Sequence, residues 1–413
     1  MKNENIYGLI GNPLGHSFSP QIHAGLGDYI YKLFPMEESE VEGFLTRREF
    51  KAINVTIPYK QTVMPYCDRI SPEALAIGSV NTIVKEEDGT LSGYNTDYFG
   101  FTLMLKRAGI DPEGKKCLIL GSGGSCKTVK CVLRDMGASS ITVISRQGED
   151  NYDNIAKHSD AQVIVNTTPV GMYPKNGAQA VDLDVFSQLT GVADLIYNPE
   201  KTALMLQAER KGIPCTGGLY MLVAQGAKAS EFFHNTTYPA FVIERVYNEV
   251  NSKMRNIVLV GMPGCGKSSV AKELARLTGK EVVDCDDYIT EKHGKSPAEI
   301  ITRDGEAAFR RIETEALKEL TKRSGIILST GGGCVTVDQN HDLLRQNGRV
   351  IFLNRDVELL PTDGRPLSAG GIEKLKAMYE KRLPMYRKVC DTEIALTSES
   401  TVKTTAKKIT EMI

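Results

Sequence analysis

Short apolar runs rich in β-branched residues alternate with amphipathic stretches along most of the chain. Such runs occupy residues 116–120, 141–144, 162–166 and 191–196. Strand-like and helix-like segments that alternate in this order are typical of α/β folds, in which helices cross over between parallel strands. The pattern therefore predicts an α/β protein with parallel sheets.

The alternation starts afresh near Asn256, where the apolar run 257–260 leads into a second glycine-rich turn. Just upstream, residues 239–253 place their apolar side chains at a helical spacing. No Gly/Ser-rich or Pro-rich linker separates this helix from the next strand, so we expect a short, stiff connection between two units. The length of 413 residues agrees with two or three domains of about 150 residues each.

The charged residues nearly cancel, because 50 Lys and Arg against 51 Asp and Glu leave a formal net charge of −1. Without a net basic field, general binding to nucleic acid is not expected. No apolar run approaches the ~20 residues that a membrane-spanning helix needs. Residues 1–10, which run directly into the segment 11–15, are typical of a strand and turn and not of a secretion signal. We therefore expect a cytoplasmic protein that binds neither nucleic acid nor membranes.

The nine cysteines include no Cys-x-x-Cys pair, and the six histidines are dispersed without the spacing of metal ligands on one helix face. Reduced, mostly buried thiols are the expected state of the cysteines. The sequence therefore gives no reason to expect a structural zinc site.

A glycine-rich turn follows the predicted strand 116–120. It reads Gly121-Ser122-Gly123-Gly124-Ser125-Cys126 and precedes a helical stretch over 127–136. Strand, glycine turn and helix in this order present backbone N–H groups and a helix N-terminus to the pyrophosphate of a dinucleotide. Cys126 stands where the fingerprint has Gly or Ala, which weakens the match slightly. The candidate cofactor-binding residues of this turn are Gly121, Gly123, Gly124 and Ser125.

Ser145-Arg146-Gln147 follows the next predicted strand, at the position where an NAD enzyme presents an acidic residue to the ribose hydroxyls. An arginine there suits a ribose 2′-phosphate, which favours NADP(H), with Ser145 and Arg146 as contacts. The alternative interpretation is that Arg146 is an ordinary solvated charge at a strand end.

The second glycine-rich turn fits the pattern G-x-x-x-x-G-K-[ST] in full, directly after the predicted strand 257–260 and before a helical run over 269–277. Backbone N–H groups of such a loop wrap the phosphates of ATP, Lys267 would reach the β/γ oxygens, and the Ser268 hydroxyl would ligate Mg²⁺. The predicted nucleotide contacts are Gly264, Cys265, Gly266, Lys267, Ser268 and Ser269.

Five further motifs occur in order between residues 5 and 250. They are Gly11-Asn12-Pro13-Leu14-Gly15-His16-Ser17-Phe18-Ser19-Pro20, Asn54-Val55-Thr56-Ile57-Pro58-Tyr59-Lys60, Gly78-Ser79-Val80-Asn81-Thr82, Gly93-Tyr94-Asn95-Thr96-Asp97 and Gly218-Leu219-Tyr220-Met221-Leu222-Val223-Ala224-Gln225. Together these motifs resemble the shikimate dehydrogenase family. The resemblance implies a substrate-binding domain over residues 1–100, rejoined by helices within 219–253, and an NADP-binding Rossmann domain over 101–218.

The same resemblance implies which residues bind the substrate and the cofactor. The hydroxyls of Ser17 and Ser19 would bind the substrate's carboxylate. Thr56, Asn81 and Gln225 would bind its ring hydroxyls. In addition, Gly218 would lie beside the cofactor.

The chemistry of a ketone reduction agrees with two of the matched residues. Hydride delivery to carbon requires a proton for the oxygen, and a cationic donor near that oxygen lowers the barrier by charge stabilisation and by proton transfer. Lys60 has this chemistry, and the resemblance makes Asp97 the carboxylate that keeps it charged or relays its proton. Outside these motifs Lys60 would be an ordinary surface lysine and Asp97 a helix cap, and the identity of the net proton carrier stays open.

A second set of motifs lies within residues 255–400. It comprises Val282-Val283-Asp284-Cys285-Asp286-Asp287, Gly305-Glu306-Ala307-Ala308-Phe309-Arg310-Arg311-Ile312-Glu313, Gly331-Gly332-Gly333, Gly364-Arg365-Pro366-Leu367 and Arg382-Leu383-Pro384-Met385-Tyr386-Arg387. With the preceding phosphate loop, these motifs resemble the shikimate kinase family. The resemblance implies a P-loop kinase domain with a parallel sheet over residues 254–413.

By this resemblance, Asp286 orients and deprotonates the acceptor hydroxyl, while Asp284 supports the Mg²⁺ shell through water. The Gly332 amide faces a ring hydroxyl of the acceptor. Arg365 lies in a mobile lid and stabilises the charge on the transferring phosphoryl group.

The resemblance also places two arginines on the acceptor's carboxylate, which agrees with the bidentate geometry of guanidinium and carboxylate. They are Arg310, held by Glu313, and Arg387. For Arg387 taken alone, the alternative is a solvated charge on a helix end.

Two segments are shorter than is usual in these families. Residues 23–31 lie in the substrate-binding domain, and we expect their shortness to affect oligomer packing more than activity. Residues 357–365 lie in the kinase lid and place Pro361 where an adenine-contacting arginine is common, so we expect a difference in nucleotide affinity or lid closure.

The two resemblances imply consecutive reactions: reduction of 3-dehydroshikimate to shikimate by NADPH, and phosphorylation of shikimate to shikimate 3-phosphate by ATP. They predict a bifunctional enzyme of aromatic amino-acid biosynthesis that uses NADP(H), ATP and Mg²⁺, has small-molecule substrates as partners, and is a monomer or homodimer. Two alternatives stay open. The N-terminal half would prefer quinate with NAD, or one half would be a noncatalytic module, against which the complete sets of charged residues argue.

Overall fold

The computed structural model of the chain describes residues 6–15, 17–360 and 371–413. The chain divides into two compact units, Met1–Asn251 (unit 1) and Ser252–Ile413 (unit 2). Each unit has hydrophobic core clusters made only of its own residues. The α/β fold predicted from the alternation is confirmed, with three sheets in all.

The first sheet of unit 1 has six strands in the order β2-β1-β3-β5-β6-β4. The strands are β1 (Tyr7–Gly11), β2 (Tyr31–Pro35), β3 (Ala52–Val55), β4 (Arg69–Ile70), β5 (Thr82–Lys85) and β6 (Leu91–Tyr94). The sheet is mixed rather than parallel, because β5 and β6 are joined by a tight turn and β5 pairs antiparallel with both β3 and β6. A short connection of this kind cannot return the chain to a parallel register.

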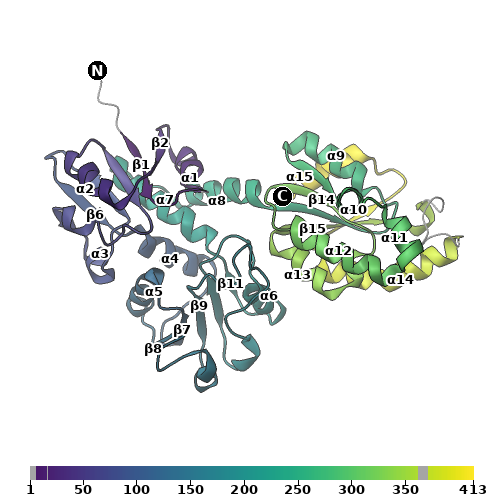
Figure 1. The fold of residues 1–413 in the computed structure, drawn as a ribbon, viewed down its shortest axis with the longest axis horizontal. Helices are drawn as coiled ribbons and strands as arrows, with labels where there is room; N and C mark the ends of the chain where they lie inside the picture. The colour runs from purple at the N-terminus through teal and green to yellow at the C-terminus, as the bar shows by residue number, and fades with distance from the viewer. Residues whose placement is uncertain (1–5, 16, 361–370) are drawn as a thin grey trace. The chain divides into compact units, whose positions relative to one another are not determined.

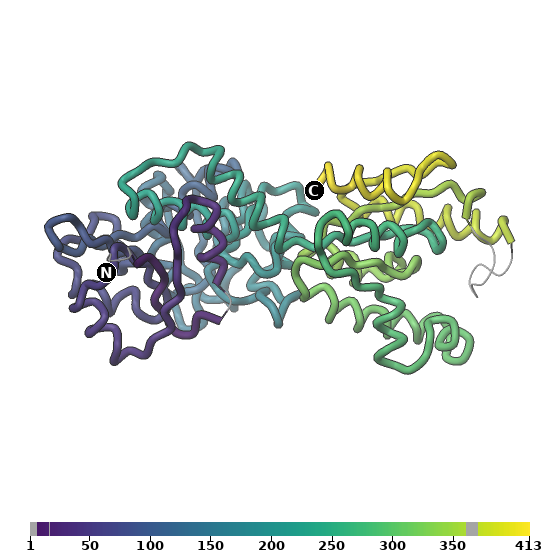
Figure 2. The backbone as a smooth tube through the Cα atoms, turned by 90° about the horizontal axis from the view of Figure 1, so that it is seen from above, coloured from purple at the N-terminus to yellow at the C-terminus, as the bar shows by residue number. Residues whose placement is uncertain are grey.

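Helices cover both faces of this sheet. They are α1 (Ser19–Leu26), α2 (Glu38–Arg47), α3 (Pro72–Ile77) and α7 (Leu219–His234). Helix α4 (Thr96–Arg107) packs against α7, and α8 (Ala240–Met254) follows α7 in the chain. Val41 and Leu45 lie four residues apart on α2, on one side of the helix, and both are buried in the cluster formed by α2 and one face of the sheet. The other face packs against α7, whose Ala229 and Phe233 join Tyr7 of β1 in a second cluster. Figure 2 shows the same proximity, with the teal segment beside the purple N-terminal one.

The second sheet of unit 1 is parallel throughout, in the order β11-β10-β9-β7-β8. The strands are β7 (Lys116–Leu120), β8 (Ser140–Ile144), β9 (Val163–Asn166), β10 (Gly191–Asp194) and β11 (Cys215–Thr216). Helices α5 (Gly124–Asp135) and α6 (Ala203–Arg210) lie on opposite sides of it (Figure 1). The predicted strands are confirmed, but β10 ends two residues early, because the Asp194 carboxylate accepts the backbone N–H of Ile196 and turns the chain out of the sheet.

Unit 2 is built on a five-stranded parallel sheet in the order β13-β14-β12-β15-β16. The strands are β12 (Asn256–Val260), β13 (Glu281–Asp284), β14 (Ile326–Ser329), β15 (Gly348–Arg355) and β16 (Thr392–Leu396). The helices are α9 (Lys267–Thr278), α10 (Cys285–His293), α11 (Pro297–Asp304), α12 (Glu306–Leu320), α13 (Asp338–Gln346), α14 (Gly371–Val389) and α15 (Val402–Thr410). Helices α9 and α15 cover one face and α12, α13 and α14 the other (Figure 1).

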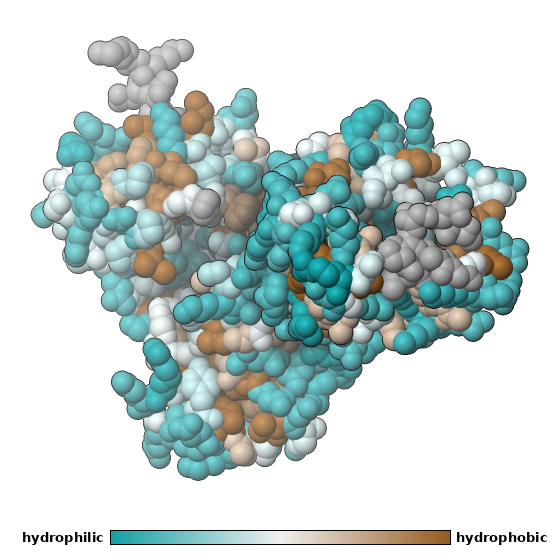
Figure 3. Space-filling model, turned by 45° about the vertical axis from the view of Figure 1, so that its right-hand side comes forward, coloured by the Kyte–Doolittle hydropathy of each residue, from teal (hydrophilic) through white to brown (hydrophobic). Residues whose placement is uncertain are grey.

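The surface view of the molecule is largely hydrophilic, and its cysteines are free thiols. On the face seen in Figure 3, hydrophilic residues cover most of each unit and hydrophobic ones form small patches. Among the helices that the structure describes, none is both long and apolar enough to cross a membrane. All nine cysteines are free, six of them buried and three half-buried.

Candidate active sites

A cavity of about 270 Å³ opens in unit 1 at the carboxyl ends of β1 and β3, two neighbouring parallel strands of the first sheet. Both strands are fully buried, which fixes the residues that follow them. The five residues predicted to bind the substrate all line this cavity, together with both predicted catalytic groups. They are Ser17, Ser19, Thr56, Asn81, Gln225, Lys60 and Asp97.

Lys60 and Asp97 form an ion pair on the cavity wall. Lys60 follows β3, and Asp97 lies in the first turn of α4. The Lys60 Nζ donates to Asp97 Oδ2 over 2.6 Å, and both side chains are partly shielded from solvent. A charged amine held by a carboxylate in a small polar cavity is able to donate a proton to a bound oxygen and to stabilise negative charge on it.

Hydrogen bonds among the wall residues hold their polar atoms in place. The Asn81 Oδ1 accepts from the Thr96 backbone N–H over 2.7 Å, and the Thr96 hydroxyl donates to Gln225 Oε1 over 3.2 Å. At the start of α1, the Ser17 hydroxyl oxygen accepts from the Ser19 backbone N–H over 3.2 Å. Among the described residues, the cavity is therefore lined by hydroxyl and amide groups, several of them held by hydrogen bonds, beside the Lys60–Asp97 ion pair.

Sequence reasoning missed Tyr197 and Asn54, which also line this cavity. Tyr197 follows β10 by three residues and packs edge-on against Phe18 at 6.1 Å between ring centroids. Its signal was its place just beyond the end of a parallel strand, where ligands of open α/β sheets bind. Asn54 stood inside a matched motif, and its buried amide donates to Thr82 Oγ1 over 3.0 Å.

The predicted cofactor residues of unit 1 gather at the carboxyl edge of the second sheet. Gly121 follows β7 with φ +100°, and a Cβ there would lie 2.7 Å from the Thr168 methyl, so the turn requires glycine. Gly123, Gly124 and Ser125 are exposed at the start of α5, where a Cβ on either glycine would meet no atom within 4 Å. Backbone N–H groups at this helix start are therefore open to a pyrophosphate.

Ser145 and Arg146 follow β8, the strand beside β7. The two strand ends are tied by a hydrogen bond from Gly121 N–H to Ile144 O over 2.8 Å. Arg146 is exposed, whereas Asp150, four residues on, pairs with His158 over 2.7 Å. Gly218 caps α7 and donates to Ile196 O over 2.9 Å, which places it at the end of β10.

The phosphate loop of unit 2 lies between β12 and α9, as its pattern predicts. Gly264 and Gly266 have φ of +84° and +105°, and Gly266 caps α9, which begins at Lys267. The Lys267 Nζ donates to the carbonyls of Gly261 and Met262 over 2.9 and 3.1 Å, inside the curve of the loop. Cys265 is buried, and Ser268 and Ser269 lie in the first turn of α9. The loop thus has the curvature and the cation of a phosphate cradle.

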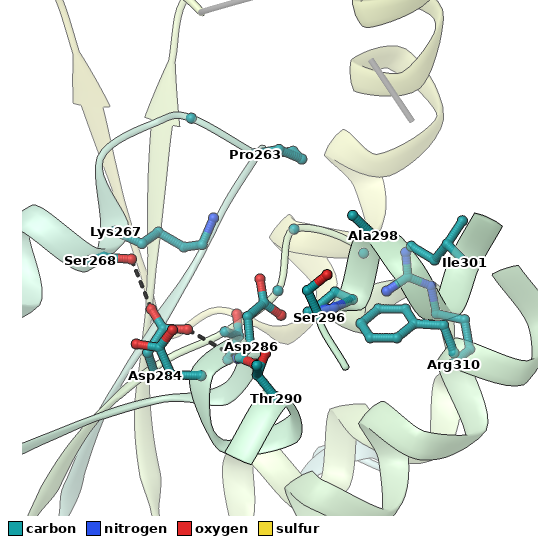
Figure 4. A pocket seen from close by; sticks show the side chains of 18 of the residues that line it. Pro263, Lys267, Ser268, Asp284, Asp286, Thr290, Ser296, Ala298, Ile301 and Arg310 are labelled. Carbon is teal, nitrogen blue, oxygen red and sulfur yellow. Dashed lines mark hydrogen bonds between the residues drawn. The ribbon is translucent and has the colours of Figure 1, made fainter. Parts of the chain in front are cut away.

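Two carboxylates face the loop from the β13–α10 junction. The Ser268 hydroxyl donates to Asp284 Oδ2 over 2.8 Å, and Asp284 Oδ1 caps α10 by accepting from the Asp286 N–H over 3.0 Å (Figure 4). The Asp286 Oδ1 is buried and has no hydrogen-bond partner within the described ranges. Burial raises the pKa of Asp286, and Asp284 raises it further, against Lys267 and Arg310.

A cavity of about 600 Å³ joins the phosphate loop to these carboxylates and to α11 and α12. Figure 4 shows Lys267, Asp286 and Arg310 around the same space. Arg310 is held by Glu313 Oε2 at 2.6 Å and Glu306 Oε1 at 3.0 Å. Glu313 is fully buried, and burial raises its pKa, opposed by Arg310. The carboxylate pair therefore fixes the direction of the guanidinium.

The loop 331–333 lines this cavity, and its glycines let neighbouring side chains approach the backbone closely. A Cβ on Gly333 would lie 2.0 Å from Arg310 Nη2, and a Cβ on Gly331 would lie 2.4 Å from Glu313 Oε1. Gly332 lines the cavity, as predicted from its motif, and its carbonyl accepts from Arg382 Nη1 over 3.1 Å and from the Tyr386 hydroxyl.

The expectation for Arg387 requires a correction. Arg387 is exposed near the end of α14, is absent from the residues that line the described cavity, and pairs with Glu393 of β16 over 2.9 Å. Arg382, five residues earlier in the same motif, is buried and lines the cavity. The helical spacing explains the difference, because Arg382 falls on the buried stripe of α14 with Leu375, Tyr386 and Val389.

The remaining predicted positions concern the lid and the metal. Arg365 and Pro361 lie outside the residues that the structure describes. Within that described part, no cluster of three or more His, Cys, Asp or Glu side chains could hold a metal ion alone. Ser268 and Asp284 nevertheless supply adjacent hydroxyl and carboxylate oxygens, the donors that Mg²⁺ prefers when phosphates and waters complete its shell.

Two family descriptions match the chain. Residues 9–83 match the shikimate dehydrogenase substrate binding domain. Residues 263–413 match shikimate kinase. The first match includes Ser17, Ser19, Thr56, Lys60 and Asn81 of the smaller cavity and ends before Asp97, and the second covers most of unit 2.

One relative and two solved structures each cover about 60% of the chain. A shikimate dehydrogenase (NADP(+)) of Clostridium perfringens (strain SM101 / Type A) is 37% identical over 269 residues, which cover 60% of this chain and 99% of the relative. The crystal structure of a chorismate mutase/shikimate 5-dehydrogenase fusion protein from Clostridium acetobutylicum is 36% identical, with a TM-score of 0.57 over 60% of this chain and 98% of that one. The shikimate 5-dehydrogenase of Thermus thermophilus, in complex with NADP(H) and shikimate, is 30% identical, with a TM-score of 0.54 over 59% and 99%.

Proposed function

The chain belongs to the shikimate dehydrogenase family and continues into a shikimate kinase domain, and from this premise we propose which of its residues perform the two reactions. It is a bifunctional enzyme of the shikimate pathway. Unit 1 reduces 3-dehydroshikimate to shikimate with NADPH, and unit 2 phosphorylates shikimate with ATP to give shikimate 3-phosphate. We assign substrate binding in unit 1 to residues 1–100 and 219–253, NADP binding to residues 101–218, and the kinase to residues 254–413.

The contact between Lys60 and Asp97 inside the smaller cavity carries the assignment of the reduction. Lys60 donates its proton to the ketone oxygen and stabilises the negative charge that develops on it, while Asp97 holds the ammonium in position. The hydride comes from the nicotinamide of NADPH when the cofactor is bound. A cation already fixed 2.6 Å from its partner needs little reorganisation during the reaction.

The other cavity residues fix the orientation of the substrate. The hydroxyls of Ser17 and Ser19 bind the carboxylate, since both residues line the cavity where the chain passes from β1 to α1. Thr56, Asn81 and Gln225 line the rest of the wall and bind the ring hydroxyls. Hydrogen bonds that already tie Asn81 and Gln225 to Thr96 keep these amides in one rotamer, which favours a single pose.

We assign the dinucleotide to the carboxyl edge of the second sheet, where the structure fits it. The glycine-only position 121 and the exposed start of α5 leave room for the pyrophosphate beside Gly123, Gly124 and Ser125. Ser145 and the exposed Arg146 bind the 2′-phosphate of NADP(H), and Gly218 borders the nicotinamide end. The preference for NADPH over NADH therefore rests on Arg146.

In unit 2, the single cavity shared by Lys267, Asp286 and Arg310 carries the assignment of the phosphoryl transfer. Asp286 Oδ1, buried and without a partner among the described residues, accepts the proton of the acceptor hydroxyl. Arg310 and Arg382 bind the carboxylate of shikimate, and Arg382 replaces Arg387 in this role. The Gly332 amide faces a ring hydroxyl.

The nucleotide side of unit 2 is assigned from the same geometry. Lys267 binds the β- and γ-phosphate oxygens, and the amides of the loop around Gly264, Cys265 and Gly266 wrap the phosphates together with Ser269. Ser268 holds Mg²⁺ directly and Asp284 holds it through water, which agrees with their oxygen donors. When bound, the ion neutralises charge on the phosphates. Arg365 is assigned to the charge on the transferring group from its motif alone.

A coupled assay on the full chain tests both halves at once. Purified protein receives 3-dehydroshikimate, NADPH and Mg-ATP, and shikimate 3-phosphate is measured by mass spectrometry. Lys60→Ala is expected to abolish reduction and spare phosphorylation, and Asp286→Asn to do the reverse. Parallel arms with quinate and NAD measure the alternative substrate pair, and a higher kcat/KM for that pair would overturn the assignment of unit 1.

A further inference from the structure

The carboxylate of Asp194 lies fully buried at the last residue of β10. Its Oδ1 accepts from Asn166 Nδ2 and from the Ile196 backbone N–H, each over 3.0 Å, and its Oδ2 accepts from the Thr202 hydroxyl over 2.7 Å. All three donors are neutral. Burying an ionised group beside neutral partners is costly, so a residue of this kind indicates that the positions of its donors matter.

The donors belong to three segments that meet at the carboxyl edge of the second sheet. Asn166 is the last residue of β9, and its Oδ1 accepts from the Thr168 backbone N–H over 3.0 Å and the Thr168 hydroxyl over 2.7 Å. Thr168 in turn lies against Gly121, where a Cβ would approach its methyl group to 2.7 Å. One chain of hydrogen bonds and contacts thus runs from Asp194 through the end of β9 to the glycine turn after β7.

The same carboxylate sets the path of the chain toward the smaller cavity. Its bond to Ile196 N–H bends the backbone directly before Tyr197, which lines that cavity. Ile196 O also accepts from Gly218 N–H over 2.9 Å, and a Cβ on Gly218 would lie 2.1 Å from Leu195 O. The start of α7 therefore packs against residues 195–196, whose backbone is held by Asp194. Helix α7 in turn carries Gln225, which lines the cavity.

We propose that Asp194 is a positioning residue for hydride transfer: it fixes the ends of β9 and β10, and with them Tyr197 and the start of α7, relative to the glycine turn that holds the dinucleotide. The inference rests on the proposed function of unit 1. Hydride transfer is steep in distance and angle, so loosening this junction costs rate more than binding. The pyrophosphate and the substrate's carboxylate keep their own contacts on the glycine turn and on the loop after β1.

The test uses kinetics of the full chain with three variants. Asp194→Ala removes all three acceptor contacts. Asp194→Asn keeps an oxygen for Asn166 and Ile196. Thr202→Val removes the Oδ2 contact together with the weak cap that the Thr202 hydroxyl gives Met205 N–H at the start of α6. These two variants carry the test if the alanine variant unfolds. The matched control is Glu231→Ala, which removes another buried carboxylate of unit 1. Glu231 accepts from Lys228 Nζ at 2.8 Å and from Tyr238 N–H at 2.7 Å, lies six residues after Gln225 on α7, and does not line the described cavity. Phosphorylation by the same samples measures the concentration of chain with a folded unit 2, and the calorimetric transition of unit 1 checks that unit 1 of each variant is folded at the assay temperature.

We expect Asp194→Ala to lower kcat of the reduction at least about tenfold while KM for NADPH and 3-dehydroshikimate stays within about threefold. Asp194→Asn should restore most of this loss, and Thr202→Val should lower kcat with the same unchanged KM. Glu231→Ala should lower the melting temperature and leave kcat unchanged. An unchanged kcat in Asp194→Ala, or in Thr202→Val where the alanine variant unfolds, would overturn the proposal, and so would an equal kcat loss in Glu231→Ala. If the wild-type chain reduces no 3-dehydroshikimate, the proposed function of unit 1 is wrong, which is a different outcome from a failure of this inference.

Discussion

Arg382 and Arg387 lie five residues apart on α14, yet they differ in burial, in their ion pairs and in whether they line the larger cavity. Arg382 is buried against Gly332 O and lines the larger cavity, whereas Arg387 is exposed and already paired with Glu393. A guanidinium fixed in a sheltered cavity binds a carboxylate far more strongly than one on the surface. We therefore expect Arg382→Lys to raise KM for shikimate about tenfold or more, because lysine cannot reproduce the planar fork.

The matched control is Arg387→Lys, measured in the same phosphorylation assay. Its KM for shikimate should equal that of the wild type. A rise in KM for Arg387→Lys with none for Arg382→Lys would restore Arg387 as the carboxylate ligand. Circular dichroism of both variants checks that α14 is intact.

The burial of Asp194 also predicts how the stability of unit 1 depends on pH. Burial raises its pKa from 3.8 to about 6, against hydrogen bonds from Ile196, Thr202 and Asn166, all of which are neutral. The folded state therefore binds this proton more tightly than the unfolded chain. Its favourable contribution is present below about pH 4 and is lost as pH rises through about 6, a change of about 3 kcal/mol in the free energy of unfolding.

The comparison that isolates this effect is between the wild type and Asp194→Asn, which has no proton to lose. Calorimetry of the full chain from pH 4 to pH 7 should show the stability difference between the two proteins moving in favour of the variant as pH rises. A difference that is constant across this range would show that Asp194 titrates normally.

At the scale of elements, α14 supports the loop 331–333 that lines the larger cavity, because two of its side chains donate to Gly332 O. Tyr386 is fully buried, stacks on Phe352 of β15 at 4.8 Å between ring centroids, and donates its hydroxyl to Gly332 O. Tyr386→Phe keeps the stacking and removes only this hydrogen bond. Because one buried hydrogen bond contributes about 1 kcal/mol, KM for shikimate should rise about fivefold.

The effect of Tyr386→Phe should be confined to phosphorylation. Reduction of 3-dehydroshikimate by the same sample serves as the internal control and should be unchanged. An unchanged KM for shikimate would show that Arg382, which donates to the same carbonyl, holds Gly332 without help.

The alternation of apolar runs was enough to predict the two parallel sheets, because most of their strands are buried on both faces and so read as continuous apolar runs. It did not predict the antiparallel pairing of β5 with β3 and β6, which depends on the short turn between β5 and β6 rather than on hydrophobicity. The end of β10 was misplaced for a similar reason, since the side chain of Asp194 ends the strand inside an apolar run.

The candidate sites were predictable where a motif fixes several residues by close approach. The phosphate loop and Gly121 are examples, because the backbone there takes conformations that favour glycine. Tyr197 could not be predicted from a pattern, since it joins the cavity through the fold of β10 and not through its neighbours in sequence. The choice between Arg382 and Arg387 required the phase of α14, which places only one of them on the buried stripe.

At the scale of the whole molecule, each of the core clusters described above consists of residues of one unit. Leu328 lies fully buried in β14, within the core of unit 2. Leu328→Ala is expected to destabilise unit 2 by about 2–5 kcal/mol, through lost burial and the cavity left behind. Calorimetry should show one transition moving to lower temperature, while kcat of the reduction measured below that transition stays at the wild-type value.

A substitution in the core of unit 1 tests whether the activity of unit 2 is independent of the stability of unit 1. Ile164 is fully buried in β9, and Ile164→Val should destabilise unit 1 by about 1 kcal/mol without changing phosphorylation. Loss of both activities on either substitution would show that the two cores fold as one cooperative block.

The distribution of thiols makes the chain suitable for a distance measurement between its two units. Six cysteines are shielded, and of the three half-buried ones Cys67 and Cys215 belong to unit 1 and Cys390 to unit 2. Burial raises the pKa of Cys67 and Cys215 to about 11, so nitroxide labelling calls for mildly alkaline buffer. Removing either Cys67 or Cys215 leaves one label on each enzyme, and pulsed electron resonance of that pair would read out whether shikimate or nucleotide draws the dehydrogenase and the kinase together.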